Sequence, residues 1–300
     1  MHAILSSLFD GIREDFGYPV KLVRLLEERK DIRVDLRPPP LFIGARSVVR
    51  WDQLGEPPAI PWSTHKRGNL LGWKWSESHH YGSFQLSRPE FHQLGYCDIE
   101  NDWECDISEV QGFSNSKSNL EDFTSTDMMV ETNSFSMIDE ISPAKLAKNL
   151  DHKEIRIIHS PGADYFSRFQ WDGRLFLMNH GGSHHFAAAK YIAKRLEEPV
   201  PLRGQLRTYS LNAVAIASLR RDFEMFVISD ETTIALAFHE AMTAFRATWL
   251  WHYMPRPFEN TKGILLPKNE PRSMRVAALL KQAGVADLGQ HLAFLATKNL

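Results

Sequence analysis

The stretch of sequence that decides the fold is DGRLFLMNHGGSHHFAAA, at residues 172–189. Residues 174–178 form a short apolar run between turn formers, which predicts a buried β-strand. Residues 179–182 contain two consecutive glycines and predict a tight turn. Residues 183–198 place apolar side chains at helical spacing, which predicts an amphipathic helix. The expected order is therefore strand, glycine turn and helix.

This turn has two interpretations. A glycine turn lets the backbone approach an anion closely, and the helix that follows offers unpaired N–H groups with a partial positive charge. Ser183, His184 and His185 add a hydroxyl donor and two imidazoles that can donate to phosphate oxygens. The same arrangement is also an ordinary structural device, and spacing alone does not separate the two.

The surrounding sequence predicts a mixed α/β arrangement. Ser142 followed by Pro143 is typical of a helix start, and residues 154–158 predict a strand that a loop at 161–164 follows. Three further elements are expected downstream: a strand at 206–211, a helix at 213–219 and a strand at 223–229. We therefore predict an α/β (α+β) fold for residues 137–230.

The rest of the chain divides into three parts. Residues 1–110 are rich in tryptophan and proline and predict extended segments and turns after one or two amphipathic helices in residues 1–30. Residues 111–136 are rich in serine and asparagine and are expected to be a linker or loop. Residues 231–300 are expected to be helical, at 232–253, 273–283 and 286–295. These helices either pack on the α/β core or form a homodimer interface.

Residues 172–189 resemble the second signature of the ParB/sulfiredoxin superfamily. In that signature a strand ends in a Gly-x-His-Arg or Gly-Gly-Cys-His-Arg turn, and an Ala-Ala-rich helix follows. Ile141-Ser142-Pro143 with Leu146 resembles the segment that precedes it, and residues 198–201 resemble the exit into the next strand. The resemblance covers residues 137–230 only. It implies a ParB/sulfiredoxin-like central domain, with an irregular Trp/Pro-rich region before it and helices after it.

Members of this superfamily bind nucleotide phosphates at the turn. Sulfiredoxins use ATP to repair an oxidised peroxiredoxin cysteine, chromosome-partition members bind and hydrolyse CTP, and others phosphorylate free serine. The resemblance thus implies that the bound molecule is ATP or another nucleotide, with or without Mg²⁺, or a small phosphorylated ligand. The residues that it assigns to this ligand are consecutive: Asn179, His180, Gly181, Gly182, Ser183, His184 and His185.

Two residues depart from the superfamily pattern. Ser183 stands where sulfiredoxins carry the reactive cysteine, and a serine cannot form a thiosulfinate, so sulfiredoxin activity is not expected. His185 stands where the superfamily usually has arginine, and histidine is a weaker, pH-dependent phosphate partner. The prediction is a nucleotide- or phosphate-binding protein, with NTPase or phosphotransferase chemistry left open. The candidate catalytic residues are Ser183, His184, Asp139 and Glu140.

Other polar residues are weighed for the same site. A phosphotransferase needs a carboxylate, and Asp164 and Asp172 are further candidates, although a solvated surface carboxylate is the commoner case. Four arginines are candidate anion contacts: Arg203, Arg207, Arg220 and Arg221. Three histidines lack a recognised metal-ligand spacing, so no metal site is expected: His79, His80 and His92. Four tryptophans are expected to pack rather than to stack on bases: Trp51, Trp62, Trp73 and Trp75.

Whole-chain properties restrict the class of protein. The 35 basic and 37 acidic residues give a formal net charge of −2, which provides no global attraction for DNA or an anionic membrane. No apolar run reaches the length of a membrane span, and a cytoplasmic protein with reduced Cys97 and Cys105 is expected. Two alternatives stay open. One is a DNA-associated regulator with a nucleotide switch, which the few basic residues of the C-terminal part disfavour, and the other is an inactive interaction protein.

Overall fold

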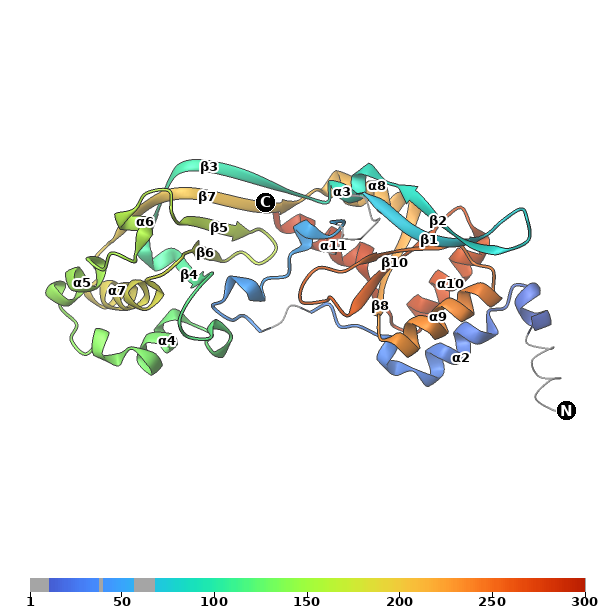
Figure 1. The fold of residues 1–300 in the computed structure, drawn as a ribbon, viewed down its shortest axis with the longest axis horizontal. Coiled ribbons are helices and arrows are strands. Elements are labelled where there is room, and N and C mark those ends of the chain that lie inside the picture. Colours follow the sequence, from blue (N-terminus) through green and yellow to red (C-terminus); the bar gives the residue numbers. More distant parts are fainter. Residues whose placement is uncertain (1–10, 38–39, 57–67, 300) are drawn as a thin grey trace.

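The computed structural model describes residues 11–37, 40–56 and 68–299. These residues form two β-sheets, one toward each end of an elongated molecule (Figure 1). A five-stranded sheet with its helices makes one lobe, and a six-stranded sheet with its helices makes the other. The fold is thus mixed α and β, as the sequence predicts.

The five-stranded sheet combines strands from distant parts of the chain. Its order is β3 (Gly95–Asp106), β7 (Pro201–Leu211), β5 (Tyr165–Phe169), β6 (Leu175–Met178) and β4 (Val110–Phe113). β3 and β7 form a long antiparallel pair that runs toward the second lobe (Figure 1). β6 pairs in antiparallel with β5 and in parallel with β4. The predicted strand at 174–178 therefore lies inside this sheet.

Helix α7 (Ser183–Leu196) packs on this sheet through its alanine-rich face. Residues 187–189 are three fully buried alanines, and such small side chains let a helix approach a sheet closely. Phe186 on the same helix packs edge-to-face on Phe113 of β4, with 5.6 Å between ring centroids. Helices α4 (Thr126–Asn133) and α5 (Pro143–Leu150) pack against α7 in turn. The start of α7 is thereby fixed relative to β4 and β6.

The six-stranded sheet is antiparallel and has helices on both faces. Its order is β11 (Ala286–Asp287), β8 (Phe223–Ser229), β10 (Thr261–Pro267), β9 (Trp249–Tyr253), β1 (Asn69–Trp75) and β2 (Tyr81–Ser87). Phe226 and Ile228 of β8 face one core, and Met225 and Val227 face the other. This alternation is the period of two that a strand imposes on its side chains.

Each face of that sheet has its own set of helices. One core contains residues of α2 (Val20–Glu28), α9 (Thr232–Ala244) and α10 (Pro271–Gln282). The other contains residues of α3 (Pro89–His92), α8 (Ala213–Asp222) and α11 (Leu288–Ala296). The second core also includes Phe169, Trp171 and Phe176 of the five-stranded lobe. The two lobes therefore share one continuous apolar core.

An irregular segment also joins the lobes. Arg33 forms a bridge to Ile228 of β8, and Gly44 forms a bridge to Phe113 of β4. The described residues between 33 and 56 thus contact both lobes, which agrees with the extended segments and turns predicted there. Trp51 in this segment is buried, as expected for a packing residue, whereas Trp62 lies outside the described residues.

Several predicted elements are confirmed. The helix start at Ser142 is present, and its hydroxyl accepts from the Lys145 N–H at 3.2 Å. The helices predicted at 183–198 and 213–219 are α7 and α8, and the strand predicted at 223–229 coincides with β8. The strand predicted at 206–211 is the second half of β7, which begins earlier, at Pro201.

The strand predicted at 154–158 is wrong. Residues of this run form the short helix α6 (Arg156–His159), which buries Ile157. A short apolar run fits a strand and a buried helical turn equally well, and only the partner decides. β5, the next strand in the chain, pairs with β6 and β7 instead.

The prediction of a wholly helical C-terminal part is also wrong. The run at 232–253 splits, because α9 ends at Ala244, Arg246 takes a left-handed conformation with φ of 52°, and β9 follows. Residues 249–253 read WLWHY, and aromatic residues favour strands. β10 is a further strand that the sequence pattern did not predict. The last two predicted helices are confirmed as α10 and α11.

The regions expected to be irregular contain regular elements. Residues 1–110 carry β1, β2 and β3. The expected linker at 111–136 carries most of β4 and all of α4, which begins where the Ser125 hydroxyl accepts from the Met128 N–H at 3.1 Å. In the part of the chain that the structure describes, no helix has both the length and the apolar character to cross a bilayer.

Candidate phosphate-binding site

The turn between β6 and α7 requires glycine at its last position. Gly182 has φ of +71°, and a Cβ there would lie 2.6 Å from the Glu154 carbonyl oxygen and 2.8 Å from the Ile155 nitrogen. Both neighbours are backbone atoms, which cannot rotate away. The turn therefore lies directly against residues 154–155, and this contact sets where α7 begins.

Asn179 fixes the other side of the turn. Its side chain is buried, and its amide nitrogen donates to the carbonyls of Asn115 and Gly181, at 2.9 Å in each case. Its amide oxygen accepts from the Asn115 N–H at 3.2 Å. The turn is thereby tied to the loop 115–118, which the sequence pattern assigned to a linker.

Backbone donors are available where α7 begins. The N–H of Phe186 is the first in this helix to find an acceptor, the Gly182 carbonyl at 2.9 Å. Within the described residues, the N–H groups of Ser183, His184 and His185 have no hydrogen-bond partner. Three donors and the positive end of the helix dipole thus converge on one place, as an anion site needs.

A pocket of about 690 Å³ lies at this turn. Four short segments contribute to its lining: 115–118, 133–137, 152–154 and 180–185. Most of its polar groups are hydroxyls, amides and imidazoles, and Lys117 provides a cation. Glu154 is the single carboxylate among the described lining residues. The lining therefore suits an anionic ligand with many oxygen acceptors.

His184 holds two parts of the wall together. Its Nδ1 lies 2.5 Å from the Ser134 hydroxyl, and its Nε2 lies 3.1 Å from the Ser118 hydroxyl. Burial, with a smaller effect from Lys117, lowers the pKa of His184 below its ordinary value. With both ring nitrogens engaged, this residue positions the wall and presents no free nitrogen to a ligand.

His185 stands between this pocket and a second hollow. Its ring stacks on His152 with 3.7 Å between centroids, and its Nδ1 lies 3.1 Å from Asn149 Oδ1. Burial lowers the pKa of His185, and the neighbouring His152 and His184 add to the effect. The second hollow has a volume of about 550 Å³ and shares Met137, His152, Glu154 and His185 with the first. Together they form one elongated depression.

His180 and Asp164 form an imidazole–carboxylate pair at the pocket. Asp164 is 2 % exposed, and its Oδ1 accepts both from the His180 backbone N–H at 3.1 Å and from His180 Nδ1 at 2.9 Å. An ionised carboxylate only accepts, so Nδ1 carries the proton and Nε2 is left as an acceptor. The His180 side chain is 61 % exposed and lines the pocket. This arrangement can take a proton from a group bound there.

The sequence was compared with models of known protein families, and one family matches. The sequence model of a family described as "Family of unknown function (DUF6685)" matches residues 100–299. The chain belongs to this family. The DUF6685 match includes the turn, the loop 115–118 and Asp164, while β1 and β2 precede it. No curated protein and no solved structure matches the sequence.

The remaining candidate catalytic residues of this DUF6685 chain support the site or lie outside it. The Ser183 hydroxyl donates to the Ser116 hydroxyl at 2.9 Å and so connects α7 with the loop 115–118. Asp139 pairs with Lys145 at 2.7 Å and does not line the pocket. Glu140 is exposed and also lies outside the lining. Sequence proximity therefore did not bring these two carboxylates to the turn.

The other polar candidates also lie away from the turn. Asp172 pairs with Arg174 at 2.7 Å where the two lobes meet. None of the four candidate arginines lines the pocket. Arg203 pairs with Asp102, and Arg221 pairs with Asp222. Arg207 lies over the Tyr165 ring, and Arg220 lines a different hollow. The cation that the structure brings to the turn is Lys117, which sequence reasoning missed.

Among the described residues that line the pocket at the turn, Glu154 is the carboxylate available to a metal ion. Among the described residues, no group of three or more histidine, cysteine, aspartate or glutamate side chains is placed to hold a metal ion. His80 instead contacts the hydroxyls of Ser76 and Ser78. Mg²⁺ bound with a nucleotide takes most of its ligands from phosphates and water, and Glu154 is the lining residue that fits as a protein ligand.

Acidification is expected to loosen this pocket. Burial lowers the pKa of His184 and His185, so as the pH falls through the ordinary histidine range the unfolded chain binds protons that the folded chain does not. The free energy of unfolding therefore falls as the pH drops through about 6.5, the ordinary histidine value. We expect His184→Gln to show a smaller fall than the wild type in urea unfolding at pH 7.5 and 5.5. Equal falls in both proteins would contradict this assignment.

Proposed function

We propose that this DUF6685 protein binds a nucleotide, or another small phosphorylated ligand, in the pocket at the start of α7, in the manner of ParB/sulfiredoxin-like proteins. The observation that carries the proposal is the set of three N–H groups at residues 183–185 without partners among the described residues. These N–H groups directly follow Gly182, where a Cβ would clash with the backbone of residues 154–155. Residues 183–185 line the same pocket as Lys117. Phosphate oxygens satisfy all of these donors at once.

The size of the depression favours a ligand larger than inorganic phosphate. The second hollow extends the pocket beyond the His152–His185 stack, and its lining combines Lys148 and Lys153 with the carboxylates of Asp151 and Glu154. Both lysines are exposed, whereas Lys145 in the same hollow is paired with Asp139. A phosphate group on the turn with the rest of the molecule across the histidine stack would use both hollows. A nucleotide has this size and polarity.

A ligand screen with a lysine variant tests the proposal. We expect ATP, CTP, GTP or ADP, with or without Mg²⁺, to raise the melting temperature, because a ligand that binds the native state stabilises it. Lys117→Ala should weaken the binding about ten-fold, the range of a lost charged hydrogen bond. Lys194→Ala is the matched control, since Lys194 is an exposed lysine in the last turn of α7.

The screen can also contradict the proposal. Isothermal titration calorimetry gives the affinity of each protein for the nucleotide that produces the largest thermal shift. Equal affinity in the wild type, Lys117→Ala and Lys194→Ala would place the ligand elsewhere. No thermal shift with any of the nucleotides would remove the nucleotide assignment.

The His180–Asp164 pair favours a second candidate function, hydrolysis of the terminal phosphoanhydride bond of a bound nucleoside triphosphate. In this step a water oxygen attacks the terminal phosphorus, and one water proton passes to His180 Nε2. The bond from phosphorus to the bridging oxygen breaks, and the leaving group keeps its electron pair. The Asp164 carboxylate stabilises the positive charge of the resulting imidazolium by accepting a hydrogen bond from His180 Nδ1 at 2.9 Å. NTPase activity is therefore the chemistry that we propose for the same pocket.

A further inference from the structure

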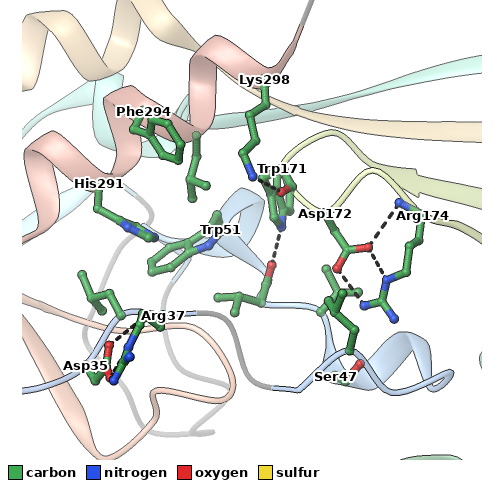
Figure 2. Close-up of a pocket in the computed structure, with 15 residues that line it drawn as sticks. Asp35, Arg37, Ser47, Trp51, Trp171, Asp172, Arg174, His291, Phe294 and Lys298 are labelled. Carbon is green, nitrogen blue, oxygen red and sulfur yellow. Dashed lines mark hydrogen bonds and ion pairs between the residues drawn. The ribbon is translucent and has the colours of Figure 1, made fainter. Parts of the chain in front are cut away.

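A separate cavity lies where the two lobes meet. Its volume is about 410 Å³, within the range of small-molecule sites. Its wall is formed by the irregular segment that joins the lobes, within residues 35–51, by the turn between β5 and β6, and by the helix α11 (Figure 2). It shares no lining residue with the pocket at the start of α7.

The wall of this cavity is largely apolar. Trp51 and Trp171 are buried in it, and the Trp171 indole N–H is already used, because it donates to the Val49 carbonyl at 2.8 Å (Figure 2). At the rim, Phe294 is 60 % exposed and Leu41 is 56 % exposed. Large apolar side chains that stay in water beside a tryptophan-lined wall indicate a surface for an apolar ligand.

The charges at the cavity do not cancel. Asp35 pairs with Arg37, and Asp172 pairs with Arg174. Lys298 has no such carboxylate partner among the described residues; its Nζ donates to the Trp171 carbonyl at 3.3 Å (Figure 2) and lies 5.5 Å from the centroid of the Phe294 ring. Within the part of the chain that the structure describes, no carboxylate lies within ion-pair distance of this Nζ.

His291 on the opposite side adds no positive charge at neutral pH. Its ring is 5.0 Å from that of Trp51, and burial lowers its pKa, with a smaller contribution from Lys298. The lining therefore has one cation in excess at the edge of an apolar wall. A ligand with a single anionic group is the charge complement of this arrangement.

We infer that this cavity binds a small monocarboxylate with an aromatic or aliphatic body. The body lies between Trp51, Trp171 and Phe294, and the carboxylate accepts from Lys298. The mostly apolar lining excludes a highly charged nucleotide, so the inference does not depend on the proposed function. Because both lobes contribute to the wall, occupancy stabilises their junction.

Matched probes separate the apolar contact from the charge contact. We would titrate 4-phenylbutyrate and decanoate into the full-length protein by calorimetry, with 4-phenylbutanol and decanol as the uncharged counterparts. The wild type should bind each carboxylate about ten-fold more tightly than the matching alcohol, as a charged hydrogen bond predicts. Lys298→Gln should remove that difference and leave the affinity for the alcohols unchanged.

A second variant tests where the body lies. Phe294→Ala should weaken carboxylate and alcohol alike several-fold, and Phe16→Ala is its control, since Phe16 is 87 % exposed and does not line the cavity. Melting curves of the variants establish that each is folded. Absence of binding by both carboxylates at millimolar concentration would overturn the inference. So would a carboxylate preference that Lys298→Gln leaves intact, or affinities that Phe294→Ala does not change.

Discussion

Replacement of Gly182 by alanine is expected to lower the free energy of unfolding by about 2–4 kcal/mol. Two effects add. The left-handed conformation at φ of +71° is strained for any residue with a Cβ. The new Cβ would also lie 2.6 Å from the Glu154 carbonyl oxygen, so the turn and residues 154–155 must move apart. Chemical denaturation followed by circular dichroism measures the loss.

Gly162 provides the control that separates these two effects. It has φ of +88°, and nothing lies within 4 Å of the position of its Cβ. Gly162→Ala should therefore show the conformational cost alone, about 1 kcal/mol. If Gly182→Ala were no worse than Gly162→Ala, the close contact between the turn and residues 154–155 would be wrong.

The part of the fold that could be predicted is the part with local signals. Ser142 and Pro143 start a helix through a cap and a fixed φ, and both effects act within one turn of the chain. The strand β6, the glycine turn and α7 also follow from neighbouring residues alone. Each of these elements has a pattern that no distant partner needs to complete.

The elements that were missed depend on distant partners. β1 and β2 form a hairpin, as do β9 and β10, but the first hairpin joins the sheet only where β1 pairs with β9 and Leu71 lies opposite Trp251. The run at 232–253 is mostly apolar, so nothing in its hydropathy marks the change from helix to strand at residues 245–248. Pairing across more than a hundred residues leaves no local pattern.

The candidate site shows the same division. Residues 179–185 were identified because the turn is contiguous. The loop 115–118 was assigned to a linker, since its serines and asparagines are also typical of loops, and only the contacts of Asn179 show that it completes the pocket. Among the carboxylates considered, Asp164 reaches the site because β5 and β6 are antiparallel neighbours, which brings residue 164 beside residue 180. Asp139 has no such connection.

His180→Gln is expected to slow hydrolysis of the bound nucleotide about 100-fold, because general-base catalysis contributes about 10²–10⁴-fold. The affinity for the nucleotide should change little, since the N–H groups of residues 183–185 and Lys117 are untouched. Release of inorganic phosphate under saturating nucleotide measures the rate, and calorimetry measures the affinity. A wild type that binds nucleotide without releasing phosphate would contradict hydrolysis and leave the binding proposal standing.

Asp164→Asn tests whether the carboxylate acts through His180. The asparagine oxygen can still accept from the His180 backbone N–H, so the turn keeps its shape, but the negative charge that stabilises the imidazolium is lost. Asp164 Oδ2 is buried and has no hydrogen-bond partner among the described residues, which is costly for a carboxylate that serves only the fold. We therefore expect a clear loss of hydrolysis with little loss of stability. The reverse result, normal hydrolysis in a destabilised protein, would make Asp164 a structural residue.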